Sequence, residues 1–270
     1  MAYKKIGVFG GNGLLGKEVT RALVEEGFDV VPFSRSAEPQ SISGAQTQQI
    51  TSETSLVGFD VIVSTVGPSG WADQIPLIAR AKADGVKRFI PSEFGMDHRG
   101  QHVDYLTPKE NSLKAVQEAG FPDGWTAFIN GFFETVVSMM TKLDLSTSTL
   151  KVVGKGTTEY PFVFRHDIGR AIAQTLKAPP EAYKDSWVVL ASAWASGNQI
   201  AQWIEEAVGK KITIEHVEPD ASTPIIHLLE KTGGNVFERG IETKGLGVEW
   251  GDFEAYVKTW TTFVNSSDQE

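Results

Sequence analysis

The sequence predicts an α/β fold with a doubly wound parallel sheet and a smaller lobe in the C-terminal half. Three observations support this class. Short apolar runs alternate with segments of helical periodicity up to about residue 130, glycines stand at many of the boundaries, and beyond residue 131 the pattern loosens into shorter elements. Alternation of this kind is typical of parallel strands whose connecting helices cover both faces of a sheet. We therefore assign residues 1–135 to the sheet domain, with part of residues 150–190 returning to it, and residues 136–270 mainly to the second lobe.

In the first half, each expected element has a local signal. Residues 5–9 form an apolar run that ends in glycines, which predicts a buried strand. Within residues 17–26, Val19, Leu23 and Val24 recur at helical spacing, and Gly27 stands where the helix would end. By the same criteria the other elements are strands at residues 29–34, 59–66, 88–91 and 125–130, helices at residues 71–84 and 108–119, and a short strand near residues 46–50.

The second half carries weaker signals. Ser196 followed by Gln199 forms a capping-box pattern, which predicts the start of a helix, and Gly209 predicts its end. The other expected elements are helices at residues 132–142 and 167–177 and extended segments at residues 150–153, 187–190 and 212–217. These short elements predict a lobe that is smaller than the sheet domain.

The composition argues against several classes of function. The formal net charge of −9 over 270 residues disfavours a nucleic-acid surface, which needs a clustered basic face. No cysteine is present, so the sequence excludes disulfides, cysteine-ligated zinc and thiol nucleophiles. The five histidines show no metal-binding spacing, and no metal site is expected. No apolar stretch approaches the ~20 residues of a membrane span, and glycines interrupt the N-terminal apolar run too early for a signal peptide, so a cytoplasmic location is expected.

Glycines at intervals of three follow the first strand and open the first helix. In a dinucleotide-binding Rossmann fold, such glycines allow a tight turn, let the main chain approach a pyrophosphate, and let helix and strand pack closely. The N–H groups of the helix N-terminus then face the anionic oxygens. A purely structural turn is the alternative. The predicted cofactor-binding residues of this loop are Gly10, Asn12, Gly13, Leu14, Leu15 and Gly16.

The end of the second strand indicates which dinucleotide is bound. An acidic residue about 20 residues past the glycine loop is typical of NAD-binding folds, because it bonds to the ribose 2′-hydroxyl. Here the strand ends in Ser34, Arg35 and Ser36, without an acid. Arginine suits a bidentate grip on a phosphate. Arg35 therefore predicts NADP(H), and the alternative is an ordinary exposed arginine.

Three segments carry a more specific signature. They are the glycine loop Gly10–Gly16, the expected strand Asp60–Gly67 and, above all, the string Lys-Arg-Phe-Ile-Pro-Ser-Glu-Phe-Gly at residues 87–95. Together they resemble the isoflavone reductase-like branch of the atypical short-chain dehydrogenases, to which the NmrA-like regulators are closely related. The resemblance is strong to about residue 135 and continues more weakly through residues 130–133, 167–169 and 196–209.

The resemblance implies an NADP(H)-binding protein with a defined set of site residues. The cofactor would lie along the glycine loop with its 2′-phosphate at Arg35, and Lys109 would be the general acid/base. The further cofactor contacts that the family implies are Thr65, Val66, Gly67, Ser92, Glu93, Phe94, Lys109, Asn130 and Phe132. The expected substrate contacts are Gly95, Met96, His98 and Phe133.

Tyr105 and Lys109 also match the Tyr-x-x-x-Lys spacing of typical short-chain dehydrogenases. Pro108 between them argues against a shared helix, because proline is favoured at the first helical position and disfavoured inside. With Thr107 as N-cap and Glu110 three residues on, the helix should begin at Pro108 and leave Tyr105 outside. Lys109 would then meet the positive end of the helix dipole, which lowers the pKa of an ammonium. The alternative is a solvated lysine balanced by Glu110.

Two functions follow from these residues. The first is an NADPH-dependent reductase of a small, aromatic or conjugated substrate, with Lys109 handling the proton. The second is an NmrA-like sensor that binds NADP(H) without turnover. A third alternative, a non-redox isomerisation at the same site, also stays open. The expected partner is a small-molecule substrate, with no nucleic acid and no membrane, and a homodimer is compatible with the sequence. The four residues that suit an apolar substrate pocket and a helix core equally well are Phe132, Phe133, Met139 and Met140.

Overall fold

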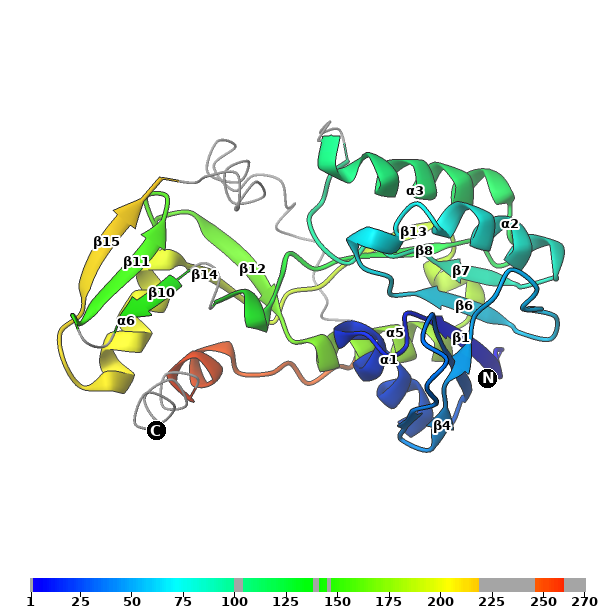
Figure 1. Ribbon diagram of the computed structural model, residues 1–270, viewed down its shortest axis with the longest axis horizontal. Coiled ribbons are helices and arrows are strands. Elements are labelled where there is room, and N and C mark those ends of the chain that lie inside the picture. Colours follow the sequence, from blue (N-terminus) through cyan, green and yellow to red (C-terminus); the bar gives the residue numbers. More distant parts are fainter. Residues whose placement is uncertain (1, 100–103, 138–140, 145–146, 219–245, 260–270) are drawn as a thin grey trace. The chain divides into compact units, whose positions relative to one another are not determined.

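The computed structural model describes residues 2–99, 104–137, 141–144, 147–218 and 246–259. These residues form two units (Figure 1). The first unit contains residues 2–129, 165–190 and 246–249, and the second contains the described residues of 130–164, 191–218 and 250–259. The chain therefore leaves the first unit near residue 130 and returns to it twice, at residues 165–190 and 246–249, before the second unit is complete.

A parallel sheet forms the centre of the first unit. Its strands β5, β2, β1, β6 and β7 lie in that order, and the bridge between Phe89 and Trp125 continues it to the parallel pair β8 and β13. The strands are β1 (Lys5–Phe9), β2 (Asp29–Ser34), β5 (Gln48–Gln49), β6 (Val61–Ser64), β7 (Arg88–Ile90), β8 (Thr126–Ile129) and β13 (Ser186–Val189), with a small hairpin of β3 (Ser41–Ile42) and β4 (Ala45–Gln46). The order reverses beside β1, as in a doubly wound fold.

Helices cover both faces of this sheet. In Figure 1, α2 and α3 lie on one face, and α1 and α5 lie on the other, where they pack against each other. The helices are α1 (Leu14–Glu25), α2 (Gln74–Ala83), α3 (Thr107–Ala119) and α5 (Arg165–Lys177), with short 3₁₀ turns at Pro68–Gly70, Asp104–Leu106 and Pro180–Tyr183. The predicted α/β class with a parallel sheet is confirmed. The first helix begins at Leu14, three residues before the expected start.

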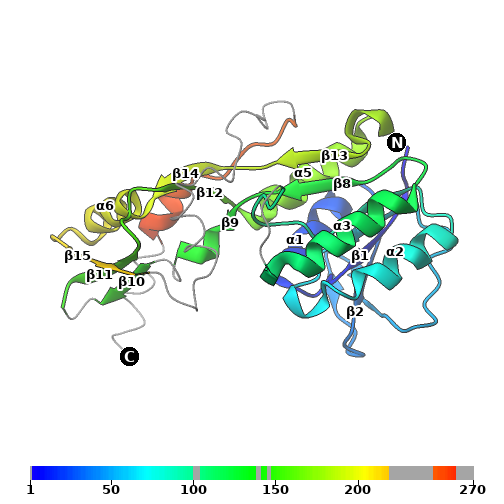
Figure 2. The same ribbon diagram turned by 90° about the horizontal axis from the view of Figure 1, so that it is seen from above.

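The second unit contains two small sheets and one long helix (Figure 2). One sheet has the order β10, β11, β15, and the other has the order β14, β12, β9. The elements are β9 (Phe132–Phe133), a 3₁₀ turn (Glu134–Val136), β10 (Thr141–Asp144), β11 (Thr149–Val153), β12 (Glu159–Val163), β14 (Ala193–Ser196), α6 (Gly197–Val208) and β15 (Thr213–Val217), and residues 253–259 are also helical. Ser196 caps α6 as predicted, because its side chain accepts a hydrogen bond from the Gln199 N–H at 3.2 Å.

Two expectations about helices are wrong. Residues 132–142 do not form one helix, because Phe132 pairs with Phe162 in a parallel ladder and Thr141–Asp144 pairs with β11. Thr107 is the first residue of α3 and not its N-cap, and the preceding Leu106 provides no side-chain cap. Tyr105 lies in the 3₁₀ turn before α3, as expected.

Candidate functional site

The loop between β1 and α1 depends on glycine at two positions. Gly10 has a φ of 79°, in the left-handed region that favours glycine. A Cβ on Gly16 would overlap the main-chain oxygen of Gly10 and would lie 2.8 Å from its carbonyl carbon. The loop therefore packs directly against the first turn of α1, which is the close approach expected of a dinucleotide loop.

The N-terminus of α1 is open to an anion. Its N-cap is Gly13, which offers no side chain to the N–H groups of the first turn. Gly10 and Gly11 donate instead to the main-chain oxygen of Phe33, at 3.1 and 3.0 Å, which fixes the loop on β2. The side chain of Leu14 is 72% exposed and that of Leu15 is buried. These two leucines can therefore bind an anion only through their main-chain N–H groups, because their side chains are apolar.

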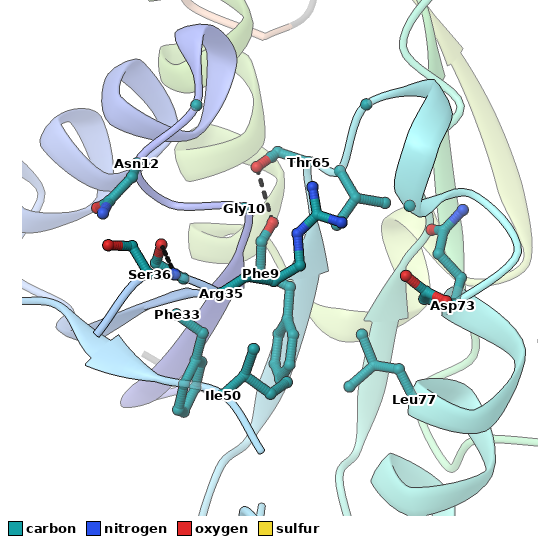
Figure 3. A pocket seen from close by; sticks show the side chains of 16 residues that line it. Phe9, Gly10, Asn12, Phe33, Arg35, Ser36, Ile50, Thr65, Asp73 and Leu77 are labelled. Carbon is teal, nitrogen blue, oxygen red and sulfur yellow. Dashed lines mark hydrogen bonds between the residues drawn. The ribbon is translucent and has the colours of Figure 1, made fainter. Parts of the chain in front are cut away.

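A pocket of about 490 Å³ lies beside this loop within the first unit (Figure 3). This volume falls within the roughly 300–1,000 Å³ of small-molecule sites. The rings of Phe9 and Phe33, 4.7 Å apart, contribute an apolar wall together with Ile50 and Leu77. The full lining is Phe9, Gly10, Asn12, Gly13, Phe33, Ser34, Arg35, Ser36, Ile50, Thr65, Val66, Gly67, Gly70, Asp73, Gln74 and Leu77.

Arg35 lies on this pocket at the end of β2, beside Ser34 and Ser36. Its side chain is exposed, and its Nη2 donates a 3.4 Å hydrogen bond to Ser69 Oγ. In Figure 3 the Arg35 guanidinium lies beside Thr65, on the side that faces away from the glycine loop. The structure thus brings Arg35 together with the predicted loop residues Gly10, Asn12 and Gly13 and with Thr65, Val66 and Gly67, whereas the predicted Leu14, Leu15 and Gly16 are not part of the pocket lining.

Lys109 is buried, so the alternative of a solvated lysine is wrong. The residue is 4% exposed, its Nζ donates a 2.9 Å hydrogen bond to the main-chain oxygen of Glu93, and Nζ lies 4.7 Å from the centroid of the Trp71 ring. The ring of Tyr105 packs edge-on against the same indole at 5.3 Å. Burial lowers the pKa of Lys109 from 10.5 to about 8, and the charge of Glu93 opposes this change. An amine with this pKa can donate or accept a proton near neutral pH.

This lysine should make the stability of the protein depend on pH. Between pH 8 and 10.5 the unfolded chain binds more protons at Lys109 than the folded chain does, so the free energy of unfolding rises with pH. Lys109→Met should therefore stabilise the fold relative to wild type at pH 7, and this gain should shrink by roughly 3 kcal/mol as the pH reaches 10.5. Urea unfolding of both proteins across this range measures the gain. A gain that is independent of pH would contradict the desolvation of Lys109.

The residues that follow β6 and β7 form a buried polar network. The N–H of Ser92 donates to Gln74 Oε1 at 2.8 Å, and Ser92 Oγ donates to the main-chain oxygen of Val66 at 2.8 Å. Since Val66 and Gln74 line the pocket, this network connects the pocket wall with the segment that carries Glu93. Phe94 stacks on Phe128 with ring centroids 6.0 Å apart.

The expected substrate contacts of the first unit are largely enclosed. Met96 is 6% exposed and His98 is 4% exposed, and Nε2 of His98 is 2.7 Å from Glu93 Oε2. Gly95 is partly exposed, and a Cβ on it would lie 3.5 Å from Lys109 Nζ. Of these positions, Gly95 is therefore the one whose main chain lies next to the amine of Lys109.

The predicted site residues beyond residue 129 are not part of the first unit. Asn130, Phe132 and Phe133 belong to the second unit. There the ring of Phe132 packs against Tyr160 and Phe162, and Asn130 Nδ2 donates to the main-chain oxygen of Gly131 at 3.3 Å. Their contacts with cofactor or substrate stay predictions. Met139 and Met140 lie outside the described residues.

Sequence reasoning missed much of the pocket wall. Phe9 and Ser34 are the final residues of β1 and β2, and Phe33 directly precedes Ser34. Their place at the ends of parallel strands, where the strand order reverses, is the signal that could have identified them. Their apolar character suggested only core packing. The other missed residues are Ser36, Ile50, Gly70, Asp73, Gln74 and Leu77.

The sequence model of the NmrA-like family matches residues 2–251 of this chain. Oxidoreductase aprR of Aspergillus flavus is 27% identical over 234 residues, which cover 80% of this chain and 78% of that protein. Eugenol synthase 1 of Petunia hybrida is 27% identical over 296 residues, which cover 95% of this chain and 96% of that protein. Within the described residues, no helix combines the length and apolar character needed to cross a bilayer.

Solved structures share the fold. AtPrR2 with NADP⁺ and (+)pinoresinol superposes with a TM-score of 0.78 at 20% identity, covering 96% of this chain and 99% of that chain. NmrA, a negative transcriptional regulator, in complex with NADP superposes with a TM-score of 0.75 at 16% identity, covering 99% of this chain and 98% of that chain. The predicted Rossmann-type architecture agrees with both.

Proposed function

Since this chain belongs to the NmrA-like family, we propose that it is an NADPH-dependent reductase that transfers hydride to a small, aromatic or conjugated substrate. The observation that carries the proposal is a single pocket that combines the uncapped N-terminus of α1 with Arg35 at the end of β2. The oxidoreductase and synthase names of the relatives at 27% identity support the same class of reaction.

The hydrogen-bond donors around the pocket match the charged groups of NADPH. The first-turn N–H groups of α1 would hold the pyrophosphate, and Arg35 with its neighbouring serines would hold the 2′-phosphate. The apolar wall of Phe9, Phe33 and Leu77 suits an adenine ring. When bound, the cofactor supplies the hydride for the reduction. We assign substrate binding mainly to the second unit.

Lys109 would manage the proton of the reduction. Trp71 and the main-chain oxygen of Glu93 hold its Nζ in one place, and burial keeps the amine away from bulk water. With a pKa of about 8, the amine is mostly protonated at pH 7 and can donate to a substrate atom that gains negative charge. The same group takes up a proton when the reaction runs in the opposite direction.

Arg35→Ala tests the cofactor assignment. Losing hydrogen bonds to a charged phosphate costs about 1.5–3 kcal/mol, so the Kd for NADPH should rise by roughly 10- to 100-fold. The Kd for NADH, which lacks the 2′-phosphate, should change little. Calorimetric titration of wild type and variant with both cofactors measures this. Arg21→Ala, in an exposed arginine on α1 that pairs with Glu18, is the matched control and should change neither Kd.

The results of this titration also separate the two functions. Tight NADPH binding by the wild type, followed by NADPH consumption in a screen of conjugated aromatic compounds, supports the reductase. Tight binding without consumption of NADPH by any compound would favour a sensor that reads the cofactor. Absence of binding to either cofactor would overturn the proposal, and the glycine loop would then serve packing alone.

A further inference from the structure

A buried acid–imidazole pair lies next to Lys109 in the first unit. Glu93 follows β7, and its Oε2 is 2.7 Å from Nε2 of His98, with the two side chains 1% and 3% exposed. The ring of Trp187 packs edge-on against the imidazole, with centroids 6.4 Å apart. A buried carboxylate is costly unless a partner compensates for its lost hydration. His98 supplies part of that compensation.

Glu93 contacts Lys109 in two ways. Its main-chain oxygen accepts the hydrogen bond from Nζ at 2.9 Å, and its carboxylate acts on the ammonium through space. The second oxygen, Oε1, is buried and accepts no hydrogen bond from the described part of the chain. An acceptor left open in the interior is most stable near a positive charge. Lys109, whose Nζ donates to the main-chain oxygen of the same residue, is positioned to supply that charge.

Other ionisable groups of the surrounding segments do not compete for this role. Asp97 and Arg99 pair with each other through hydrogen bonds of 2.8 and 2.5 Å. Among the described residues, Glu93 is the charged group whose field raises the pKa of Lys109 against the effect of burial. The remaining ionisable side chains on the adjoining segments are Asp73, Asp104, Tyr105 and Glu110.

We propose that Glu93, held in place by His98, is the counter-charge that retains the proton on Lys109 and is therefore a positioning residue for the reaction. The catalytic meaning of this pair rests on the proposed function, whereas the charge coupling does not. His98 has a structural part in it, because its Nε2 lies 2.7 Å from Glu93 Oε2 and holds the carboxylate in place. The pair explains why a lysine with almost no exposure can remain a proton donor.

Glu93→Gln tests the coupling directly. Removing the opposite charge of the Glu93 carboxylate should lower the pKa of Lys109 by about 1 unit or more from its value of about 8. The titration is followed by NMR of the protein labelled with ¹³C at the lysine Cε, and the Lys109 signal is assigned by its loss in Lys109→Met. An unchanged midpoint in Glu93→Gln would overturn the inference.

Two further variants make the result specific. Asp97→Asn removes another buried carboxylate of the same loop, one that pairs with Arg99, and should leave the Lys109 midpoint unchanged. His98→Asn frees the Glu93 carboxylate and should lower the midpoint, by less than Glu93→Gln does. If Glu93→Gln does not fold, the titration of His98→Asn tests the inference instead. An unchanged Lys109 midpoint in His98→Asn would then reject the role of the Glu93–His98 pair. An equal shift in Asp97→Asn also rejects it.

The experiment is independent of cofactor and substrate. Failure of the reductase proposal would appear as absent NADPH binding or turnover, with the Lys109 titration still responding to Glu93. Failure of the inference would appear as a Lys109 midpoint that ignores Glu93, whatever the enzyme does with NADPH. The two failures are therefore distinguishable.

Discussion

Lys109→Met is expected to lower kcat by about 10²- to 10⁴-fold, the usual contribution of a positioned general acid. Methionine preserves the length and the apolar contact with Trp71 but carries no proton at the position of Nζ. The Kd for NADPH should change much less than kcat, because Arg35 and the glycine loop hold the cofactor in the proposed complex. Consumption of NADPH with a compound identified in the substrate screen gives kcat, and calorimetry gives Kd.

Lys114→Met is the matched control for this prediction. Lys114 lies on the same helix, and its side chain is 75% exposed and 3.9 Å from Glu118. The same substitution there should leave both kcat and Kd close to wild type. If Lys109→Met turned over at the wild-type rate, the proton would have to come from another group or from water. Lys109 would then be a buried structural lysine.

Gly16→Val should strongly weaken NADPH binding. The new Cβ would overlap the main-chain oxygen of Gly10 and approach Gly11 Cα to 2.8 Å, so the loop or the helix must move. Such overpacking costs about 1–3 kcal/mol of stability. The displaced first-turn N–H groups would no longer converge on a pyrophosphate, and a loss of about 3 kcal/mol in such bonds corresponds to a Kd raised by roughly 100-fold. Calorimetric titration with NADPH and thermal unfolding of the variant measure the two effects.

The next residue supplies the control for the glycine variant. Lys17 is exposed on α1, so Lys17→Val introduces the same β-branched side chain into the same helical turn without touching the loop. It should cost little stability and leave the Kd for NADPH near wild type. If Gly16→Val bound NADPH as tightly as Lys17→Val does, the α1 N-terminus would not be the pyrophosphate site.

Local patterns were sufficient for most of the first unit. The strand at residues 29–34 and the end of α6 at Gly209 were predicted where the structure has them, because alternation, β-branched content and glycine caps act over a few residues. The clustering of Gly10, Arg35 and Thr65 around one pocket agrees with the contacts that the family resemblance implied, and its physical basis is that the carboxyl ends of neighbouring parallel strands meet at one edge of a sheet.

The same reasoning failed where distant partners decide the conformation. Residues 132–142 have an apolar pattern that fits a helix, yet Phe132 pairs with Phe162, thirty residues further along the chain. Gly131, with a φ of 62° and Pro161 against it, turns the chain into that strand. A local pattern contains no information about either partner, so the helix was an incorrect prediction.

By itself, therefore, the sequence determined the parallel sheet, the glycine loop and the basic residue at the end of β2, because each depends on the conformational preferences of neighbouring residues. Only the tertiary structure decided that Phe9 and Phe33 form a pocket wall and that Lys109 is enclosed by Trp71 and Glu93. The physical reason is burial: the pKa of Lys109 depends on how much water distant segments remove from around its amine, and that is settled when those segments pack together.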